Sequence, residues 1–292
     1  MRLGVLANAY RPGFEEAIAQ LDLWCRQGDH AVVFEASLAD YLGPDLATGE
    51  PEDIVRASDV VLAFGGDGTM LRAARIVGPL ELPILGVNLG SLGFLTQVTP
   101  DDLGAVLPQL ESGDFHTEPR SVLAVSVDGV EGLHHAVNEV AVDRGPQSRA
   151  IEIRLDADDR LVCRYVADGL IVATPTGSTA YALSAGGPVT VPDLAALIVA
   201  PVAPHTLAQR PVVFPDRVVL RITCEEPNVE AALMLDGRKT GALAYGQSCL
   251  VRRADFELKL VRLPGQDFFN LVRTKLQWGV DPRHAHRDGR VV

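Results

Sequence analysis

The sequence predicts an α/β domain with a parallel sheet, followed by a mostly β domain that resembles a sandwich. The chain has 292 residues, enough for two domains that each bury a core. Short apolar runs alternate with helical patterns in the first third, whereas strand-like segments with few helical periods follow Glu118. This change of pattern separates a predicted domain at 1–118 from a second at 119–264.

The first domain shows the pattern of alternating strands and helices. Four apolar runs predict strands, at 3–7, 31–34, 60–64 and 82–87. Apolar residues recur at helical spacing from Phe14 to Cys25, and Gly28 ends that run. A second helix is expected from Thr99 to Leu110, with Pro at its first helical position. Buried strands separated by helices form a parallel sheet that is covered on both faces.

The second domain is predicted from strand-like segments with turn residues between them. These segments are 122–127, 136–142, 151–155, 161–165, 170–173, 212–214, 218–223, 231–235 and 258–263. The last part, 265–292, contains a helical pattern between Phe268 and Trp278 that is too apolar to be free, so we expect it to pack on the first domain. The polar residues from 281 onwards are expected to fray.

Composition limits the class of protein. The chain is 47% hydrophobic and 22% charged, which is typical of a soluble globular protein, and no apolar stretch is long enough for a membrane span. We therefore expect a cytoplasmic protein without a membrane partner. The net charge of -12 argues against a nucleic-acid partner. The four scattered cysteines suggest no metal knuckle or disulfide framework, and His134-His135 and His284-Ala285-His286 lack further ligands at metal-binding spacing.

The most informative short stretch follows the strand at 60–64 and contains Gly65, Gly66, Asp67, Gly68 and Thr69. Its glycines allow close approach of a ligand, and the following helix directs backbone N–H groups toward phosphate oxygens. A carboxylate in such surroundings is able to accept a proton from an attacking hydroxyl or to hold a divalent cation. The alternative is a tight turn in which Asp67 caps a helix.

Two further polar positions lie at or within apolar strands. Asn88 ends the strand at 82–87 and is followed by spaced glycines, at the edge of the sheet where ligands of α/β proteins collect. Asn138 and Glu139 interrupt an apolar strand, so one of them points inward or into a cleft, where an adenine edge and a ribose would satisfy both. The alternatives are a structural turn at Asn88 and a solvated edge strand at Asn138-Glu139.

The longest unusual stretch runs from Ala167 to Pro188. It places Asp168 before a short strand and a run of small and hydroxylated residues, from Thr174 to Thr179, after it. Gly186, Gly187 and Pro188 then stop a short helix. Such a density of small polar residues favours a surface against a nucleotide over a core. The loops at 201–211 and 235–238 are expected at the same end of the β domain, with His205 either structural or a ligand contact.

Taken in this order, the motifs resemble those of the NAD kinase family over nearly the whole chain. The glycine turn also occurs in phosphofructokinases and in lipid kinases, whereas the stretch from Thr174 to Pro188 is particular to NAD kinases. The resemblance implies a Rossmann-like, phosphofructokinase-like α/β domain, a β domain and a site between them. It also implies a homo-oligomer, usually a homodimer or homotetramer.

The resemblance also implies roles. It makes Asp67 the general base toward the adenosine 2′-hydroxyl of NAD, with Gly65, Gly66, Gly68, Thr69 and Asn88 near the dinucleotide. Asn138 and Glu139 would hold the adenosine portion, and Arg72 and Arg149 would lie near phosphates. The rest of NAD would be surrounded by Asp168, Thr179, Ala180, Tyr181 and Ser184. Val166 and Arg238 stand where many members carry a basic residue and a Gln, respectively.

The reaction implied is transfer of the γ-phosphoryl group of ATP to NAD, with Mg²⁺ or another divalent cation bridging the phosphates of the donor and no dedicated protein ligands for the metal. Polyphosphate as a donor, NADH as an acceptor and feedback by NADPH are left open. Two alternatives are a lipid or sphingoid-base kinase with the same turn and a non-catalytic sensor of NAD or NADPH. A lipid kinase needs a deep apolar cavity, which the small hydroxylated residues do not predict.

Overall fold

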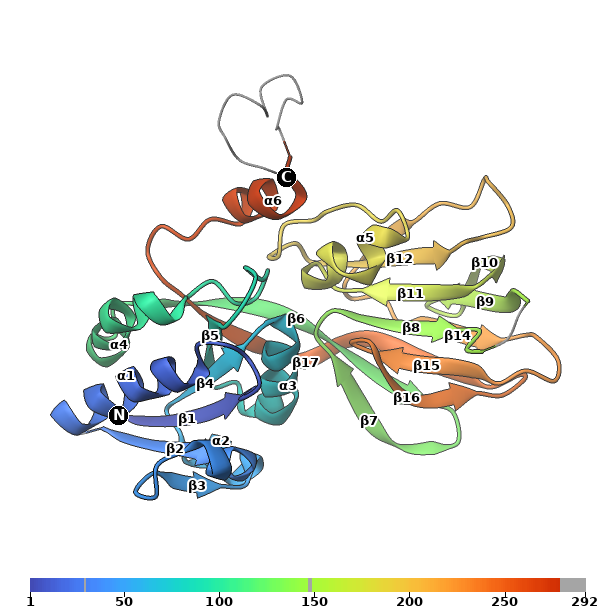
Figure 1. Cartoon of the computed structure of the whole chain (residues 1–292). Coiled ribbons are helices and arrows are strands. Elements are labelled where there is room, and N and C mark those ends of the chain that lie inside the picture. The colour runs from blue at the N-terminus through green and yellow to red at the C-terminus, as the bar shows by residue number, and fades with distance from the viewer. Residues whose placement is uncertain (29, 147–148, 279–292) are drawn as a thin grey trace. The chain divides into compact units, whose positions relative to one another are not determined.

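The computed structural model describes residues 1–28, 30–146 and 149–278, and it divides into two compact units (Figure 1). Unit 1 comprises residues 1–70 and 84–117 together with the segment that begins at Val261. Unit 2 comprises residues 71–83 and 118–260. The units differ from the predicted domains at two places. Residues 71–83, which include most of the helix at Asp67–Val77, group with unit 2, and the chain returns to unit 1 at Val261 and not at 265.

The first part of the chain alternates strands with helices. Its strands are β1 (Arg2–Ala7), β2 (Ala31–Glu35), β3 (Ala47–Gly49), β4 (Val60–Gly65) and β5 (Pro83–Asn88). Its helices are α1 (Phe14–Gln27), α2 (Pro51–Ala57), α3 (Asp67–Val77) and α4 (Leu103–Ser112), with 3₁₀ turns η1 (Ala36–Tyr41), η2 (Gly78–Leu80) and η3 (Pro100–Asp102). The strands pair in parallel in the order β5-β4-β1-β2-β3. The strand order reverses direction between β1 and β4, which is the point where α/β proteins bind ligands.

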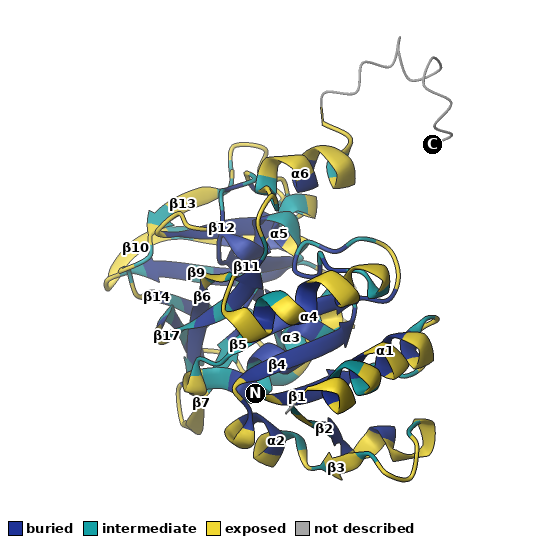
Figure 2. Cartoon of the chain, turned by 90° about the vertical axis from the view of Figure 1, so that its left-hand side faces the viewer, coloured by how far each residue is buried: buried dark blue, intermediate teal, exposed yellow. Residues whose placement is uncertain are grey.

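Successive side chains along these strands point to opposite faces of the sheet, and helices cover both faces. Leu3 and Val5 belong to a core shared with α1 and α4, whose buried residues include Leu21 and Leu107. Gly4 faces the other way, where an added Cβ would lie 2.7 Å from Ile54 of α2. Figure 2 shows β1 and β4 buried along their length, while α1 and α4 expose their outer sides. The predicted parallel sheet with helices on both faces is confirmed.

Unit 2 contains two sheets. One has the order β7-β6-β17-β14-β9-β10 and the other the order β13-β12-β11-β8-β15-β16. The strands of the first are β6 (His116–Val127), β7 (Val130–Ala136), β9 (Ile151–Ala157), β10 (Arg160–Ala167), β14 (Leu220–Cys224) and β17 (Ser248–Arg262). Those of the second are β8 (Glu139–Asp143), β11 (Gly169–Ala173), β12 (Ala196–Val202), β13 (Val212–Pro215), β15 (Ala231–Leu235) and β16 (Arg238–Leu243). Every strand pair in the second sheet is antiparallel.

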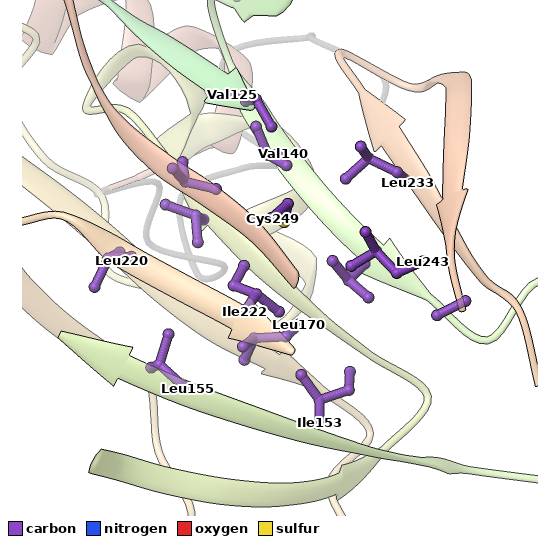
Figure 3. Packing of buried hydrophobic residues seen from close by; sticks show 14 of the residues in the cluster. Val125, Val140, Ile153, Leu155, Leu170, Leu220, Ile222, Leu233, Leu243 and Cys249 are labelled. Atoms are coloured by element: carbon purple, nitrogen blue, oxygen red, sulfur yellow. The ribbon is translucent and has the colours of Figure 1, made fainter. Parts of the chain in front are cut away.

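The two sheets of unit 2 share one hydrophobic core. Ile153, Leu155 and Ile222 come from the first sheet, and Leu170 and Leu233 come from the second; all are at most 1% exposed. Figure 3 shows these side chains from both sheets meeting in the same interior. The predicted sandwich is therefore confirmed, with the alternation of apolar and polar residues along each strand deciding which side faces inward.

Sequence patterns missed several elements and shortened others. The short strand β3, helix α2 and strands β12 and β16 were not predicted, and β17 extends over 15 residues where only 258–263 was expected. The predicted helix from Thr99 divides into η3 and α4. After a short helix α5 (Tyr181–Ser184) in unit 2, the last helix is α6 (Phe268–Leu276), which belongs to unit 1. The predicted frayed tail lies outside the described residues.

Among the described helices, none combines the length and the apolar character needed to cross a membrane.

Candidate active site

The glycine turn after β4 places Asp67 as the first residue of α3. Gly65 is buried and approaches Thr69 closely, because a Cβ built on Gly65 would lie 2.2 Å from the Thr69 hydroxyl oxygen. Asn88 ends the neighbouring strand and pairs with Gly65 in the parallel ladder. Asp67 and Asn88 therefore both follow the carboxyl ends of adjacent strands of unit 1, as the sequence predicts.

The Asp67 carboxylate is held by the loop that follows β5. Its Oδ2 accepts the Phe94 backbone N–H at 2.8 Å, and its Oδ1 accepts the Leu95 N–H at 2.9 Å. The backbone N–H and the hydroxyl of Thr96 also donate to Oδ1, each at 3.3 Å. A Cβ on Gly93 would lie 2.0 Å from Asp67 Oδ1, so only glycine permits this approach. The loop fixes the carboxylate and leaves Oδ2 with one donor among the described residues, the Phe94 N–H, and so with further acceptor capacity.

The loop that holds Asp67 is itself held from two sides within unit 1. At its start, Leu89 N–H donates to the Gly65 carbonyl at 2.9 Å. At the other side, Lys275 of α6 donates to the Leu92 carbonyl at 2.5 Å and lies 5.6 Å from the centroid of the Phe94 ring. No role for Lys275 was predicted, because no local pattern near residue 275 indicates contact with Leu92, 183 positions earlier. A helix at the end of the chain thus supports the carboxylate at its beginning.

In unit 2, Asn138 and Glu139 are positioned by a second carboxylate, that of Asp236. Asp236 accepts the backbone N–H groups of Val137 at 3.0 Å, Asn138 at 2.7 Å and Glu139 at 3.3 Å. Burial raises the pKa of Asp236, although the three backbone donors and Arg75 oppose that rise. Asp236 therefore fixes the backbone where β8 begins, a role that its position in a predicted loop did not reveal.

Glu139 is a buried carboxyl with an incomplete set of partners. It is 6% exposed, and its Oε2 atom has no hydrogen-bond partner among the described residues. Burial, followed by the charge of Asp236, raises its pKa to about 7, while a hydrogen bond from the Tyr181 backbone acts in the opposite direction. A carboxyl with this pKa is able to donate or accept a hydrogen bond near neutral pH, which suits recognition of a ligand edge.

A pocket of about 430 Å³ opens beside Glu139 and is enclosed by residues of β8, β15 and the segments that follow β8 and β15. Its polar lining residues are Glu139, Asp143, Tyr181 and Lys239. The carboxylates of Asp143, Asp168 and Glu139 all act with burial to raise the pKa of Tyr181. Asp168 forms an ion pair of 3.0 Å with Arg144, a residue that the sequence analysis did not single out. This part of unit 2 thus brings together three of the predicted residues, Glu139, Asp168 and Tyr181.

The small residues after β11 fold back on the chain at Asn138. The Thr174 N–H donates to the Asn138 carbonyl at 2.9 Å, and the Thr174 hydroxyl donates to the Val137 carbonyl at 2.6 Å. A Cβ on Gly177 would lie 2.0 Å from the Asn138 carbonyl oxygen. Part of this stretch is therefore buried and joins the backbone at 137–138 to the turn at 174–177, a role that its small residues did not suggest.

The other predicted residues occupy more open positions. Thr179 and Ala180 are half-buried, Ser184 and Arg149 are exposed, and Tyr181 is 40% exposed. Arg72 is half-buried on α3, and Gly66 and Gly68 lie in the turn and first helical residues of unit 1. His205 is exposed, and His284 and His286 lie outside the described residues. The part of the chain that the structure describes contains no group of three or more His, Cys, Asp and Glu residues arranged to hold a metal ion.

The raised pKa of Glu139 predicts how stability depends on pH. Between the ordinary value of 4.5 and about 7, the folded chain binds more protons than the unfolded chain, so the free energy of unfolding falls as pH rises. The loss amounts to at most about 3 kcal/mol, since each unit of pKa is worth about 1.4 kcal/mol. Glu139→Gln is expected to remove most of this loss, as measured by urea unfolding at pH 5 and pH 8.

Glu131→Gln, at an exposed position of β7, provides the matched control for that measurement. It is expected to keep the pH dependence of the wild type. If Glu139→Gln and the wild type lose equal stability between pH 5 and pH 8, the carboxyl of Glu139 does not titrate in this range.

An acid among backbone donors beyond the carboxyl ends of parallel strands is an arrangement suited to phosphoryl transfer, so fold and site together define a nucleotide-dependent phosphotransferase. Comparison with protein families gives the particular group. Residues 43–115 match the model of the ATP-NAD kinase N-terminal domain, and residues 137–263 match that of the ATP-NAD kinase C-terminal domain. The chain belongs to the ATP-NAD kinase family, which confirms the resemblance predicted from the motifs.

Individual relatives agree with this assignment. The NAD kinase of Geobacter metallireducens is 38% identical over 95% of this chain and 99% of its own length, and the NAD kinase of Moorella thermoacetica is 39% identical over 95% and 90%. Among solved structures, the yeast NADH kinase complexed with NADH matches with a TM-score of 0.89 at 25% identity, covering 96% of this chain and 89% of that chain. An NAD kinase from Archaeoglobus fulgidus in complex with ATP matches with a TM-score of 0.74 at 26% identity, covering 95% and 99%.

Proposed function

We propose that the chain transfers the γ-phosphoryl group of ATP to the 2′-hydroxyl of the adenosine ribose of NAD, giving NADP and ADP. The observation that carries this proposal is the Asp67 carboxylate, fixed by loop donors at the carboxyl end of β4 in a chain of the ATP-NAD kinase family. In the reaction, the 2′-oxygen forms a bond to the γ-phosphorus, the bond to the β-phosphate oxygen breaks, and the hydroxyl proton moves to a base.

Asp67 is that base in our proposal. Its Oδ1 accepts three donors from the loop at 95–96, whereas Oδ2 accepts one, from Phe94. A carboxylate oxygen has about two lone-pair positions, so Oδ2 is the atom that receives the proton. The loop donors prevent the side chain from rotating, and a positioned base is worth about 10²- to 10⁴-fold in rate.

NAD is the acceptor, and unit 2 supplies residues for its adenosine and nicotinamide portions. The pocket beside Glu139 has about 430 Å³, within the size range of small-molecule sites. Asn138 and Glu139 serve the adenosine portion, since the unpartnered Oε2 of Glu139 needs a hydrogen-bond partner that a ligand is able to supply. The remaining residues assigned to NAD in this proposal are Asp168, Thr179, Ala180, Tyr181 and Ser184.

The phosphates are bound by backbone and cationic groups. Gly65, Gly66, Gly68 and Thr69 provide the turn and the first N–H groups of α3, with Asn88 on the adjacent strand, and Arg72 and Arg149 provide positive charge. In our proposal, a divalent cation such as Mg²⁺ is held mainly by the phosphates of ATP, because Mg²⁺ is usually bound through substrate phosphates and waters in enzymes that use ATP. When bound, the cation neutralises charge on the phosphates.

The proposal extends to assembly and location. A homodimer or homotetramer in the cytoplasm is what the family resemblance suggests. Predicted domains at 1–118 and 119–264, with 265–292 returning to the first, remain our proposal for the organisation of the full chain.

The decisive experiment incubates the purified chain with ATP, Mg²⁺ and NAD and measures NADP by chromatography. NADP that accumulates only when all three are present supports the proposal, whereas its absence with every donor, including polyphosphate, contradicts it. The same incubation with a diacylglycerol or a sphingoid base tests a lipid kinase. Binding of NAD or NADPH without turnover would instead define a sensor.

A further inference from the structure

A second pocket in unit 2 has a composition that phosphoryl transfer to NAD does not explain. It has about 210 Å³ and is enclosed by α3, β7, the end of β15, the start of β16 and β17. Its charged and titratable lining residues are Arg75, Arg238, His134 and His135. Apart from Thr240, the remaining lining residues are apolar or glycine, and they include Val122, Val137, Phe256 and Leu258. All of these residues belong to unit 2.

The cations of this pocket repel one another. Burial lowers the pKa of Arg75, and the nearby charges of Arg238 and Arg72 lower it further, with Asp236 as the opposing acid. Burial, followed by the charges of His134 and Arg252, lowers the pKa of His135 and so favours its uncharged form. The lining contains no acidic side chain within the described part of the chain. In a protein with a net charge of -12, a local cluster of cations without acids is an electrostatic cost that a bound anion would offset.

Asp236, the acid that acts on Arg75, is already engaged. Both oxygens of Asp236 accept backbone N–H groups, at 3.0 Å from Val137 and 2.7 Å from Asn138. Within the described residues, neither Arg75 nor Arg238 forms an ion pair. The guanidinium donors of both residues therefore remain available to a ligand, and two such groups bind a phosphate well.

The pocket is separate from the one beside Glu139, because the sheet containing β8, β15 and β16 lies between them. Neighbouring residues along these segments line different pockets: Leu235 and Arg238 line the cationic pocket, whereas Met234 and Lys239 line the other. Successive strand residues point to opposite faces, so a ligand in one pocket does not occupy the other.

We propose that the cationic pocket is a second ligand site, which binds a phosphate monoester with a small, mostly apolar organic part. Arg75 and Arg238 bind the phosphate group. The organic part lies against Phe256, whose ring packs edge-on against His135 at 4.9 Å between centroids, and against Val122 and Leu258. A volume of about 210 Å³ equals roughly seven waters of liquid and is below the usual range for drug-sized ligands, which excludes a dinucleotide.

The test uses phenyl phosphate as the probe and the full chain labelled with ¹³C at the histidine rings. The resonances of His134 and His135, assigned with single Gln variants, are expected to shift saturably during titration, while that of the exposed His205 stays in place. Arg75→Gln combined with Arg238→Gln is expected to weaken binding at least about tenfold, because a charged hydrogen-bond partner is lost at each site. Arg160→Gln, at an exposed position of β10, is the matched control and is expected to bind like the wild type.

Two comparisons make the outcome specific. Inorganic phosphate and phenol are each expected to bind more weakly than phenyl phosphate, because each uses only one wall of the pocket. Saturating NAD is expected to leave the affinity for phenyl phosphate unchanged, because NAD occupies another pocket. The proposal is overturned if the His134 and His135 resonances show no saturable shift, or if the double variant binds phenyl phosphate as tightly as the wild type. It is also overturned if NAD displaces phenyl phosphate. If the double variant does not fold, Arg238→Gln alone, at an exposed position, provides the same comparison.

This test is independent of the kinase assay. A chain that binds phenyl phosphate but forms no NADP would retain the second site and lose the proposed function, and a chain that forms NADP without binding the probe would show the reverse.

Discussion

Asp67→Asn is expected to lower the turnover of NAD by about 10²- to 10⁴-fold, while the KM for NAD changes little. The amide oxygen is able to keep the hydrogen bonds from Leu95 and Thr96, whereas the amide NH2 group cannot accept the Phe94 N–H, so the loop loses one of its hydrogen bonds to this side chain. The amide cannot accept a proton from the ribose hydroxyl at neutral pH, and the base is lost. The measurement is steady-state NADP formation with ATP and Mg²⁺ in excess.

Two controls belong to this experiment. Asp101→Asn changes an exposed acid of unit 1 and is expected to keep the turnover of the wild type. A thermal unfolding curve shows whether Asp67→Asn has disturbed the fold, since Phe94, Leu95 and Thr96 all donate to this side chain. A folded Asp67→Asn variant with turnover near that of the wild type would remove Asp67 from the role of base.

Gly177→Ala is expected to destabilise unit 2 by more than about 4 kcal/mol, among the largest effects of single substitutions. The added Cβ would lie 2.0 Å from the Asn138 carbonyl oxygen and 2.5 Å from its carbon, so the backbone itself must move. That carbonyl also accepts the Thr174 N–H, and the movement would break this bond. Urea unfolding of the full chain measures the loss, and a chain that does not accumulate in soluble form is the extreme result.

Gly104→Ala is the matched control for this prediction. Gly104 lies inside α4, and an added Cβ there meets nothing within 4 Å. Alanine is about 1 kcal/mol more favourable than glycine in a helix, so this variant is expected to be slightly more stable than the wild type. Equal stability of Gly177→Ala and the wild type would mean that the two backbone segments are able to separate without cost.

The fold could be predicted because its signals are local. The strand at 60–64, the glycine turn and the helix after it form one continuous pattern, and the observed β4 and α3 follow that pattern closely. The alternating segments after Glu118 likewise predicted a sandwich, since the period of two decides which residues face the shared core. The short β3 and β16 were missed because the former has only three residues and the latter contains Gly241 and charged residues in place of an apolar run.

The candidate site was predicted only in part, because its partners come from distant positions. The sequence identified Asp67 but not the N–H groups at 94–96 that hold it, and a backbone donor carries no side-chain signal. It identified Asn138 and Glu139 but not their contact with Asp236, almost a hundred residues later. Arg75 and His135, which share the second pocket, belong to separate elements whose pairing no local pattern encodes.

The contact between Lys275 and the loop that holds Asp67 has a consequence for folding during synthesis, because the two segments are translated at different times. Unit 1 combines residues 1–70 and 84–117 with the segment that begins at Val261, so the loop that holds Asp67 gains its support from α6 only after residues 118–260 of unit 2 have been translated. At about 5 to 20 residues per second, the ribosome needs roughly 8 to 30 seconds between residue 117 and Leu271. During that interval unit 2 is able to fold while unit 1 still lacks the buried Leu271 and Val272. The Asp67 carboxylate of a nascent chain therefore acquires its supported position only after the whole of unit 2 has been made.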